Sequence, residues 1–219
     1  MVLSQSVVNC MEWKIESLPV PYEQAVSLMQ QRVEGIASKL QDELVWLLEH
    51  FPLYTAGTSA KGEELLTDSL FPVYTTGRGG KYTYHGPGQR IAYVMMDLKV
   101  RNICNVKLYI ESLGKWIVET LKHFSIQSYF NPNLIGVWID HNGVKEKIAA
   151  FGIRIRKWVT YHGMSINIFT DLSHYSGIVP CGIKEYGVTS LEKLGVNVSY
   201  EEFDVILKKE FYKIFPCDC

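Results

Sequence analysis

The chain has 219 residues, of which 47% are hydrophobic and 21% are charged, as in an ordinary soluble globular protein. Its 22 Lys and Arg residues are balanced by 23 Asp and Glu, so the net charge of −1 argues against a nucleic-acid-binding surface. The first residues lack the pattern of a signal peptide, and no apolar run approaches the roughly 18 residues of a membrane-spanning helix.

Five widely spaced cysteines, an odd number, do not suit a secreted disulfide-rich domain. We therefore expect a cytoplasmic protein that contacts neither membrane nor nucleic acid. At this length, a single domain spanning residues 1–219 is the expected organisation.

In the first half of the chain, apolar and polar residues alternate at 11–18, which predicts a half-buried strand. From 22 to 40, apolar residues recur every three or four positions, which predicts an amphipathic helix. A short apolar run at 44–49 predicts a buried strand, and two more strands are expected at 71–74 and 91–98.

In the second half, an apolar stripe predicts a helix at 106–124. Strands expected at 135–140 and 144–148 flank Asn142-Gly143, a dipeptide that strongly indicates a hairpin turn. Two further strands and a last helix, which starts at a capping box, are expected at 153–158, 160–169 and 199–215. Hairpins mixed with helices predict an α+β fold, with a mixed β-sheet flanked by helices.

The segment 78–89 holds four glycines and no aliphatic side chain. It is expected to be a loop outside the core, since glycine weakens helices and strands. Its N–H groups are suited to bind an anion or a polarised carbonyl group, and an ordinary surface turn is the alternative. The candidate binding residues are Arg78, Gly79, Gly80, Lys81, Tyr82, Thr83, Tyr84 and His85.

The cysteines differ in their local sequence. Cys181 lies between Pro180 and Gly182, in a bend that can present a thiol to a ligand, and the thiolate is the reactive form. A small buried side chain is the alternative for Cys181, and it is the expectation for Cys10 and Cys104.

Lys147 comes just after the predicted hairpin and before the apolar run 148–151. A solvent-facing strand end is its simplest interpretation, and a functional lysine is the alternative. Tyr-His-Gly occurs twice, at His85 and at His162, beside glycine-rich bends. A structural role is the simpler interpretation for each histidine, whereas the repetition indicates that both approach one pocket.

Cofactor motifs are missing from the sequence: it has no P-loop, no dinucleotide-binding glycine motif, no zinc-protease motif and no Cys-x-x-Cys pair. Cys217 and Cys219 are a weak indication of a soft metal, because no histidine stands near them. We therefore expect no metal and no cofactor.

Four segments together resemble one known family, the lipoate-protein ligase B family of octanoyl-[acyl-carrier-protein]:protein octanoyltransferases. They are Glu49-His50-Phe51-Pro52, 78–89, Lys147-Ile148-Ala149 and Pro180-Cys181-Gly182. The resemblance covers about residues 10–215, and R-G-G-x-x-T-x-H-G-P-G-Q is a specific pattern. It implies a fold shared with lipoate and biotin ligases.

The resemblance also implies a reaction. An octanoyl group would pass from the phosphopantetheine thiol of an acyl-carrier protein to a lysine on a lipoyl domain. The lipoyl domains belong to the E2 subunits of 2-oxoacid dehydrogenases and to the glycine-cleavage H protein. Since one thioester replaces another, neither ATP nor a metal would be required.

Residue roles follow from the same resemblance. Cys181 would carry the acyl group and Lys147 would activate it, because a nearby ammonium stabilises a thiolate that is otherwise scarce at pH 7. His85 and His162 would shape the pocket or relay protons. The acyl pocket would be lined by 78–85 and by Ala150, Phe151, Gly152, Gly163, Met164 and Ser165, with Phe151 standing where the family commonly has a smaller aliphatic residue.

Two rival functions stay open at this point. One is an ATP-dependent lipoate or biotin ligase, which makes an acyl-adenylate and needs no cysteine. The other is an acyl-binding module without turnover. The presence of both Cys181 and Lys147 argues against each of them.

Overall fold

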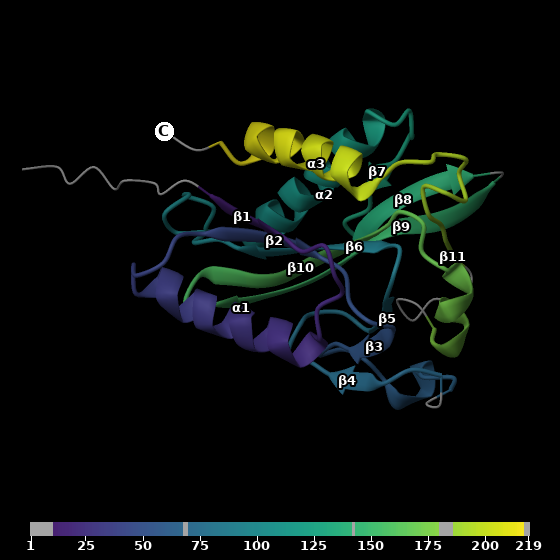
Figure 1. Cartoon of the computed structure of the whole chain (residues 1–219), viewed down its shortest axis with the longest axis horizontal. Helices are drawn as coiled ribbons and strands as arrows, with labels where there is room; N and C mark the ends of the chain where they lie inside the picture. The colour runs from purple at the N-terminus through teal and green to yellow at the C-terminus, as the bar shows by residue number, and fades with distance from the viewer. Residues whose placement is uncertain (1–10, 68–69, 142, 180–185, 217–219) are drawn as a thin grey trace, which may run out of the picture.

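The computed structural model describes residues 11–67, 70–141, 143–179 and 186–216. A large mixed sheet forms its middle layer (Figure 1). Helix α1 (Tyr22–Ala37) covers one face of this sheet, and α2 (Val106–Lys122) and α3 (Tyr200–Ile214) cover the other. The predicted α+β class, a mixed sheet flanked by helices, is confirmed.

The large sheet has the strand order β1-β2-β6-β10-β9-β8-β7, and β11 pairs with β9 in addition. Pairing is parallel between β1 and β2 and between β11 and β9, and antiparallel in the other pairs. The strands are β1 (Glu12–Ile15), β2 (Leu44–Leu48), β6 (Gln89–Met95), β7 (Tyr129–Phe130), β8 (Gly136–His141), β9 (Val144–Arg156), β10 (Val159–Asn167) and β11 (Gly187–Val188).

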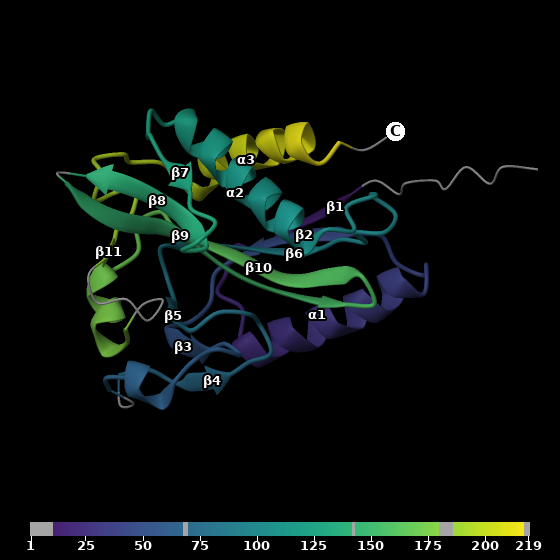
Figure 2. The same ribbon diagram turned by 180° about the vertical axis from the view of Figure 1, so that it is seen from behind.

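A small second sheet lies on the same side of the large sheet as α1 (Figure 2). Its strands are β3 (Leu53–Ala56), β4 (Val73–Thr75) and β5 (Tyr82–His85), in the order β4-β3-β5. Two short 3₁₀ helices, η1 (Gly62–Glu64) and η2 (Leu172–Gly177), lie in the connections.

Strand β6 shows how the sequence builds a core on each face of the large sheet. All of its residues are buried, as expected for a strand covered on both faces. Ile91 and Tyr93 join the α1 core, whereas Ala92 and Val94 join the core beneath α2 and α3. This alternation is the period of two that a strand imposes on its side chains.

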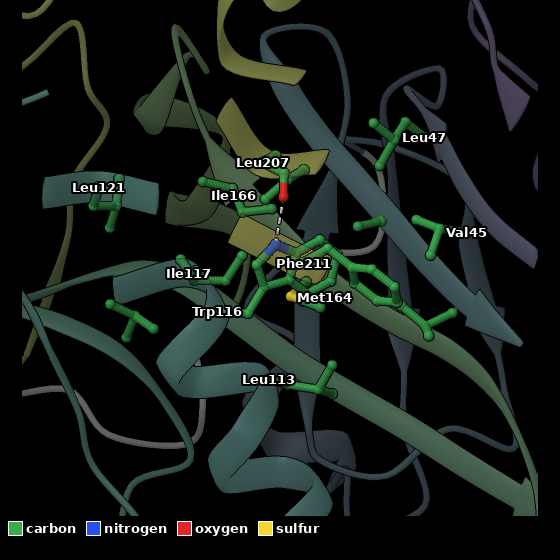
Figure 3. Close-up of a cluster of buried hydrophobic side chains, with 14 of the residues drawn as sticks. Val45, Leu47, Leu113, Trp116, Ile117, Leu121, Met164, Ile166, Leu207 and Phe211 are labelled. Atoms are coloured by element: carbon green, nitrogen blue, oxygen red, sulfur yellow. Dashed lines mark hydrogen bonds between the residues drawn. The ribbon is translucent and has the colours of Figure 1, made fainter. Parts of the chain in front are cut away.

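The core beneath α2 and α3 combines aliphatic side chains with a few aromatic rings (Figure 3). Trp116 of α2 packs edge-on against Phe211 of α3 and donates its Nε1–H to the Leu207 carbonyl over 2.7 Å. This bond satisfies the one polar atom of a fully buried indole ring, as buried tryptophans require. The two helices are thereby fixed to each other above the sheet.

The predicted hairpin across Asn142-Gly143 is confirmed for the flanking strands β8 and β9, and residue 142 lies outside the described residues. The predicted helices are confirmed, and α3 starts at the expected capping box of Ser199 and Glu202. The sequence predicts a separate strand at 153–158, but residues 153–156 are the last four residues of β9, and 157–158 form the turn that leads to β10. No helix in the described parts of the chain has the length and apolar character needed to cross a membrane.

The expectation that 78–89 is a loop outside the core is wrong for five of its residues, since Gln89 is the buried first residue of β6 and four others form β5. Tyr82–His85 form β5, which pairs antiparallel with β3. Tyr84 is fully buried, because its ring packs between Tyr54 and Phe71. Counting aliphatic residues missed this strand, since tyrosine supplied its apolar surface.

Candidate active site

A cavity of about 520 Å³ lies between the glycine-rich segment and strands β9 and β10. Its volume is within the range of about 300–1,000 Å³ that is usual for small-molecule sites. The structure brings most of the predicted site residues to its wall: Arg78, Gly79, Gly80, Lys81, Tyr82, Thr83, His85, Lys147, Ala150, Phe151, Gly152, His162, Gly163, Met164 and Ser165.

Tyr84 is the one described candidate that the structure places elsewhere. Its ring points into the cluster of Tyr54, Tyr175 and Ile178, and its hydroxyl lies 2.8 Å from His174 Nδ1. The alternation of β5 explains the difference, since Thr83 and His85 face the cavity and Tyr84 between them faces away.

Of the five cysteines, only Cys104 lies in the described residues. Cys104 is exposed, so the expectation that it is buried is wrong. Cys10 and Cys181 lie outside the described residues, as do Cys217 and Cys219. In the described residues no group of three or more His, Cys, Asp or Glu side chains could hold a metal ion.

The cavity is lined from both faces of the large sheet. Tyr22 and Tyr93 belong to the α1 side, whereas Ile110 of α2 and Met164 belong to the opposite side. The register of β9 explains how one cavity reaches both. Strand β8 pairs with β9 only as far as Ala150. Beyond that point, the glycine-rich segment 78–89 lies along the same edge of β9, where the Gly79 N–H donates to the Ile153 carbonyl over 3.0 Å.

Lys147 is a buried residue of this cavity, with 6% of its surface exposed. The interpretation as a solvent-facing strand end is therefore wrong. Its Nζ donates to the Ile135 carbonyl over 3.1 Å and lies 4.6 Å from the centre of the Trp138 ring. Both contacts stabilise an ammonium group, one as a charge-assisted hydrogen bond and one as a cation–π interaction.

Two local features of the backbone place Lys147 there. The register between β8 and β9 shifts at Val137/Trp138, and such a bulge redirects side chains next to a site. In addition, Gly136 has a positive φ of 151°, and a Cβ on it would lie 2.9 Å from Lys147 Cε. Glycine at this position therefore gives the lysine side chain its room.

Arg78 fixes the glycine-rich segment from inside. Its Nε donates to Thr55 Oγ1 over 3.0 Å, Nη1 to the Gly79 carbonyl over 2.9 Å and Nη2 to the Lys81 carbonyl over 2.8 Å. Nη2 also donates to the carbonyl and hydroxyl oxygens of Thr55, each over 2.7 Å. A guanidinium that satisfies several carbonyl groups of one bend holds the shape of that bend.

His85 continues this network, and its partners define its tautomer. Gln89 Nε2 donates to Asn167 Oδ1 and to the Tyr175 hydroxyl, so Gln89 Oε1 is the acceptor for His85 Nδ1–H at 2.7 Å. Thr55, whose hydroxyl oxygen accepts from Arg78, can direct its proton to His85 Nε2 at 3.4 Å. Burial, the nearby His50 and other charges hold the pKa of His85 well below its ordinary value.

Two more histidines are kept neutral around the cavity. His50 donates Nδ1–H to the Val20 carbonyl over 2.6 Å and accepts the Tyr93 hydroxyl at Nε2 over 2.7 Å. Burial lowers the pKa of His50 to about 4. Burial, with the charges of Arg78 and Arg154, lowers the pKa of His162 to about 4 as well. The predicted meeting of His85 and His162 at one cavity is confirmed.

Residue His162 also has a strained backbone, with a φ of +58°. Positive φ is uncommon for residues other than glycine, and such strain is concentrated at functional sites. The next residue, Gly163, packs so closely on β6 that a Cβ would lie 2.0 Å from the Ala92 carbonyl oxygen. The close contact explains why glycine follows the histidine in this wall.

The motif Glu49-His50 supports the site rather than lining it. The Glu49 carboxylate accepts the Gly88 N–H over 2.7 Å and the Tyr200 hydroxyl of α3. It thereby ties the end of the glycine-rich segment to both β2 and α3. Sequence reasoning used this motif only for the resemblance.

Several wall residues were missed as site residues: the apolar and aromatic ones follow ordinary core patterns, and Ser59 and Asn133 are exposed polar residues outside the helices and strands. The missed residues are Tyr22, Ser59, Ile91, Tyr93, Ile110, Asn133, Leu134, Ile135, Trp138 and Ile153. Ile110 belongs to the apolar stripe of α2 and Tyr93 to a buried strand. An apolar residue that faces a cavity has the same sequence signal as one that faces another side chain.

Comparison with known proteins agrees with this geometry. Residues 21–212 match the family model of the lipoyl protein ligase A/B catalytic domain. A protein named octanoyltransferase from Ehrlichia ruminantium (strain Gardel) is 82% identical over 209 residues, which cover 95% of this chain and 100% of that protein. One of the same name from Wolbachia pipientis wMel is 59% identical, over 93% of this chain and 99% of that protein.

Solved structures of low sequence identity share the fold. A bi-partite lipoate protein ligase from Thermoplasma acidophilum superimposes with a TM-score of 0.69 at 17% identity, covering 94% of this chain and 84% of that chain. LipL1 of P. falciparum, solved with lipoate, gives a TM-score of 0.72 at 16% identity, covering 94% and 62%. The family match and the near-complete coverage of its relatives show that this chain belongs to the lipoyl protein ligase A/B catalytic-domain family, in which it groups with the octanoyltransferases, enzymes of the acyltransferase class.

Proposed function

We propose that this enzyme transfers an octanoyl group from octanoyl-acyl-carrier protein to a lipoyl-domain lysine through a thioester on Cys181. The acceptors would be the lipoyl domains of 2-oxoacid dehydrogenase E2 subunits and the glycine-cleavage H protein. The observation that carries the proposal is a lysine, Lys147, held with its ammonium group buried in the wall of a largely apolar cavity. Such a cavity suits a saturated acyl chain, and a buried lysine there suits proton transfer.

The described residues that flank Cys181 come close to Lys147. Tyr186 packs edge-on against Trp138, the ring over which the Lys147 ammonium lies. Val188 of β11 pairs with Lys147 in register, and the Thr189 N–H donates to the Lys147 carbonyl over 3.0 Å. These contacts support a pairing of Cys181 with Lys147, which the P-C-G and K-I-A motifs also imply.

In the first half-reaction the Cys181 thiolate attacks the octanoyl carbonyl carbon. A new carbon–sulfur bond forms, the bond to the phosphopantetheine sulfur breaks, and that sulfur leaves with a proton from the Lys147 ammonium. The enzyme is left as an octanoyl thioester with a neutral Lys147. Because one thioester replaces another, the step needs neither ATP nor a metal.

In the second half-reaction the neutral amine of the lipoyl-domain lysine attacks the thioester. The amide bond forms, the Cys181 thiolate leaves, and Lys147 takes the proton that the attacking nitrogen loses. Both groups thereby return to their starting charges. A free catalytic thiol requires reducing conditions, so the proposal places the enzyme in the cytoplasm.

Intact-mass analysis after mixing the enzyme with octanoyl-acyl-carrier protein, without nucleotide, tests this function. One octanoyl group, labile to hydroxylamine, is expected on the native protein and on Cys104→Ala. Cys181→Ala should carry none. An adduct that persists in Cys181→Ala would refute the assignment, and octanoylation of a lipoyl domain that requires ATP and free octanoate would favour the ligase alternative.

A further inference from the structure

The α2 side of the cavity ends at a stack of aromatic residues. Phe151 of β9 lies in the cavity wall beside its cross-strand partner Met164. The Phe151 ring is stacked on the Phe130 ring of β7, with centroids 5.9 Å apart and an angle of 15° between the planes. Phe130 therefore supports Phe151 from behind, away from the cavity.

Helix α2 in turn supports Phe130. A Cβ placed on Gly114 would lie 2.4 Å from Phe130 Cδ2, so the ring occupies the space above this glycine. Glycine in the middle of a helix costs stability relative to alanine, which makes the close contact a reason for its presence. Ile110, one helical turn earlier, lies in the cavity wall itself.

The geometry points to the stack Gly114–Phe130–Phe151 as the end wall that sets the longest acyl chain the enzyme accepts. This inference rests on the proposed function, since it takes the cavity to hold the acyl chain. The reactive end of the chain would lie near Lys147, and its methyl end would reach the α2 side through the interval between Ala150 and Ile153, where β8 no longer pairs with β9.

The physical argument is one of packing against a rigid wall. Each methylene that finds room in the cavity improves binding roughly fourfold, whereas a methylene that must displace packed side chains is penalised. The wall is backed by the helix backbone at Gly114, so it yields little. Phe130 does not line the cavity, but it supports Phe151, which does. A substitution of Phe130 should therefore change the longest acyl chain that the enzyme accepts.

The test compares acyl-enzyme formation from hexanoyl, octanoyl, decanoyl and dodecanoyl carrier thioesters, read by intact mass. Phe130→Leu removes the ring behind Phe151, so the ratio of dodecanoyl to octanoyl acylation rates should rise at least roughly fourfold. Gly114→Ala pushes Phe130 toward Phe151, so the same ratio should fall. Opposite shifts in these two variants would support the inference.

Phe124→Leu is the matched control. Phe124 follows α2 and is stacked on Phe203 with centroids 5.7 Å apart and an angle of 19°, but that pair lies outside the cavity wall. The relative acylation rates of Phe124→Leu with the four chain lengths should match those of the native enzyme. Should Gly114→Ala not fold, Phe130→Leu decides alone: a native length profile in a folded Phe130→Leu overturns the inference. If the native enzyme forms no adduct with any chain, the proposed function has failed instead.

Discussion

The side chain of Lys147 fills the space that any side chain on Gly136 would need. A Cβ on Gly136 would lie 2.9 Å from Lys147 Cε and 3.1 Å from its Nζ, and also 2.9 Å from the Ala149 carbonyl oxygen. The hairpin β8–β9 thus creates a position for a buried lysine through a glycine on the opposite strand. Because the ammonium is held by the Ile135 carbonyl and by Trp138, a small displacement breaks both contacts at once.

Gly136→Ala should therefore impair catalysis by moving Lys147. A displacement of about 1 Å in a catalytic group can cost roughly 100-fold in rate, and a loss of this order is expected in octanoyl transfer. Gly195→Ala is the control, since Gly195 also has a positive φ, of +80°, but a Cβ there would meet no atom within 4 Å. Equal transfer rates in the two variants would show that the steric relation to Lys147 is unimportant.

Arg78→Lys should loosen the glycine-rich segment. A lysine has three N–H donors on a single nitrogen, so it cannot reproduce the five hydrogen bonds that Arg78 makes from three nitrogens to Thr55, Gly79 and Lys81. We expect the free energy of unfolding to fall by about 2 kcal/mol and the amide hydrogens of this segment to exchange faster.

Arg154→Lys provides the comparison for Arg78→Lys. Arg154 lies at the exposed side of the same segment and donates to the Gly77 carbonyl over 2.6 Å. A surface substitution of this kind should change the free energy of unfolding by less than about 0.5 kcal/mol. If both variants unfold alike in urea, Arg78 does not hold the segment.

The neutral histidines predict a pH-dependent stability. In the unfolded chain a histidine binds a proton below about pH 6.5, whereas the pKa of folded His50 and of folded His162 is about 4. Between about pH 4 and about pH 6.5, the unfolded state therefore binds more protons than the folded state. Stability is fully present above pH 6.5 and falls by about 1.4 kcal/mol per pH unit for each histidine as the pH drops toward 4.

The slope of the unfolding free energy against pH near pH 5 measures this effect. His50→Gln and His162→Gln should each reduce this slope by about 1.4 kcal/mol per pH unit, the value for one proton, and the double variant should reduce it by about twice as much. Unchanged slopes in both single variants would mean that these histidines do not titrate differently on folding.

Much of the fold follows from sequence periodicity. The helices, the hairpin and most of the buried strands agree with the patterns because each has a face or a run that must be apolar. The short strands β3, β5, β7 and β11 were not predicted, since a few residues with mixed side chains carry no period. Their formation depends on partners far along the chain, as the pairing of β5 with β3 shows. The single domain spanning 1–219 stays a prediction.

The site was predictable to the extent that its residues carry unusual chemistry. Arg78, His85, Lys147 and His162 stand out in sequence, and all lie at one cavity. The burial of Lys147 was not predictable, because it depends on a β-bulge and on Gly136 in the neighbouring strand. The role of Phe130 was not predictable either, because it depends on the stacking of Phe130 on Phe151 from a different strand.

The central claim is that the Lys147 ammonium activates the Cys181 thiol. An ordinary cysteine has a pKa near 8.5, and a paired ammonium favours its thiolate form. Lys147→Met keeps most of the side-chain length and removes the charge. Lys147→Arg keeps the charge but cannot act as a base, so it should retain some acylation and fail in transfer to the lipoyl-domain lysine.

The most direct measurement is the alkylation rate of Cys181 against pH, followed by peptide mass, with the exposed Cys104 as internal standard in each sample. In the native enzyme Cys181 should stay reactive well below pH 8.5. In Lys147→Met its curve should move up to the range of an ordinary thiol, while the curve of Cys104 stays in place. Identical Cys181 curves in the native enzyme and in Lys147→Met would contradict the pairing of these two residues.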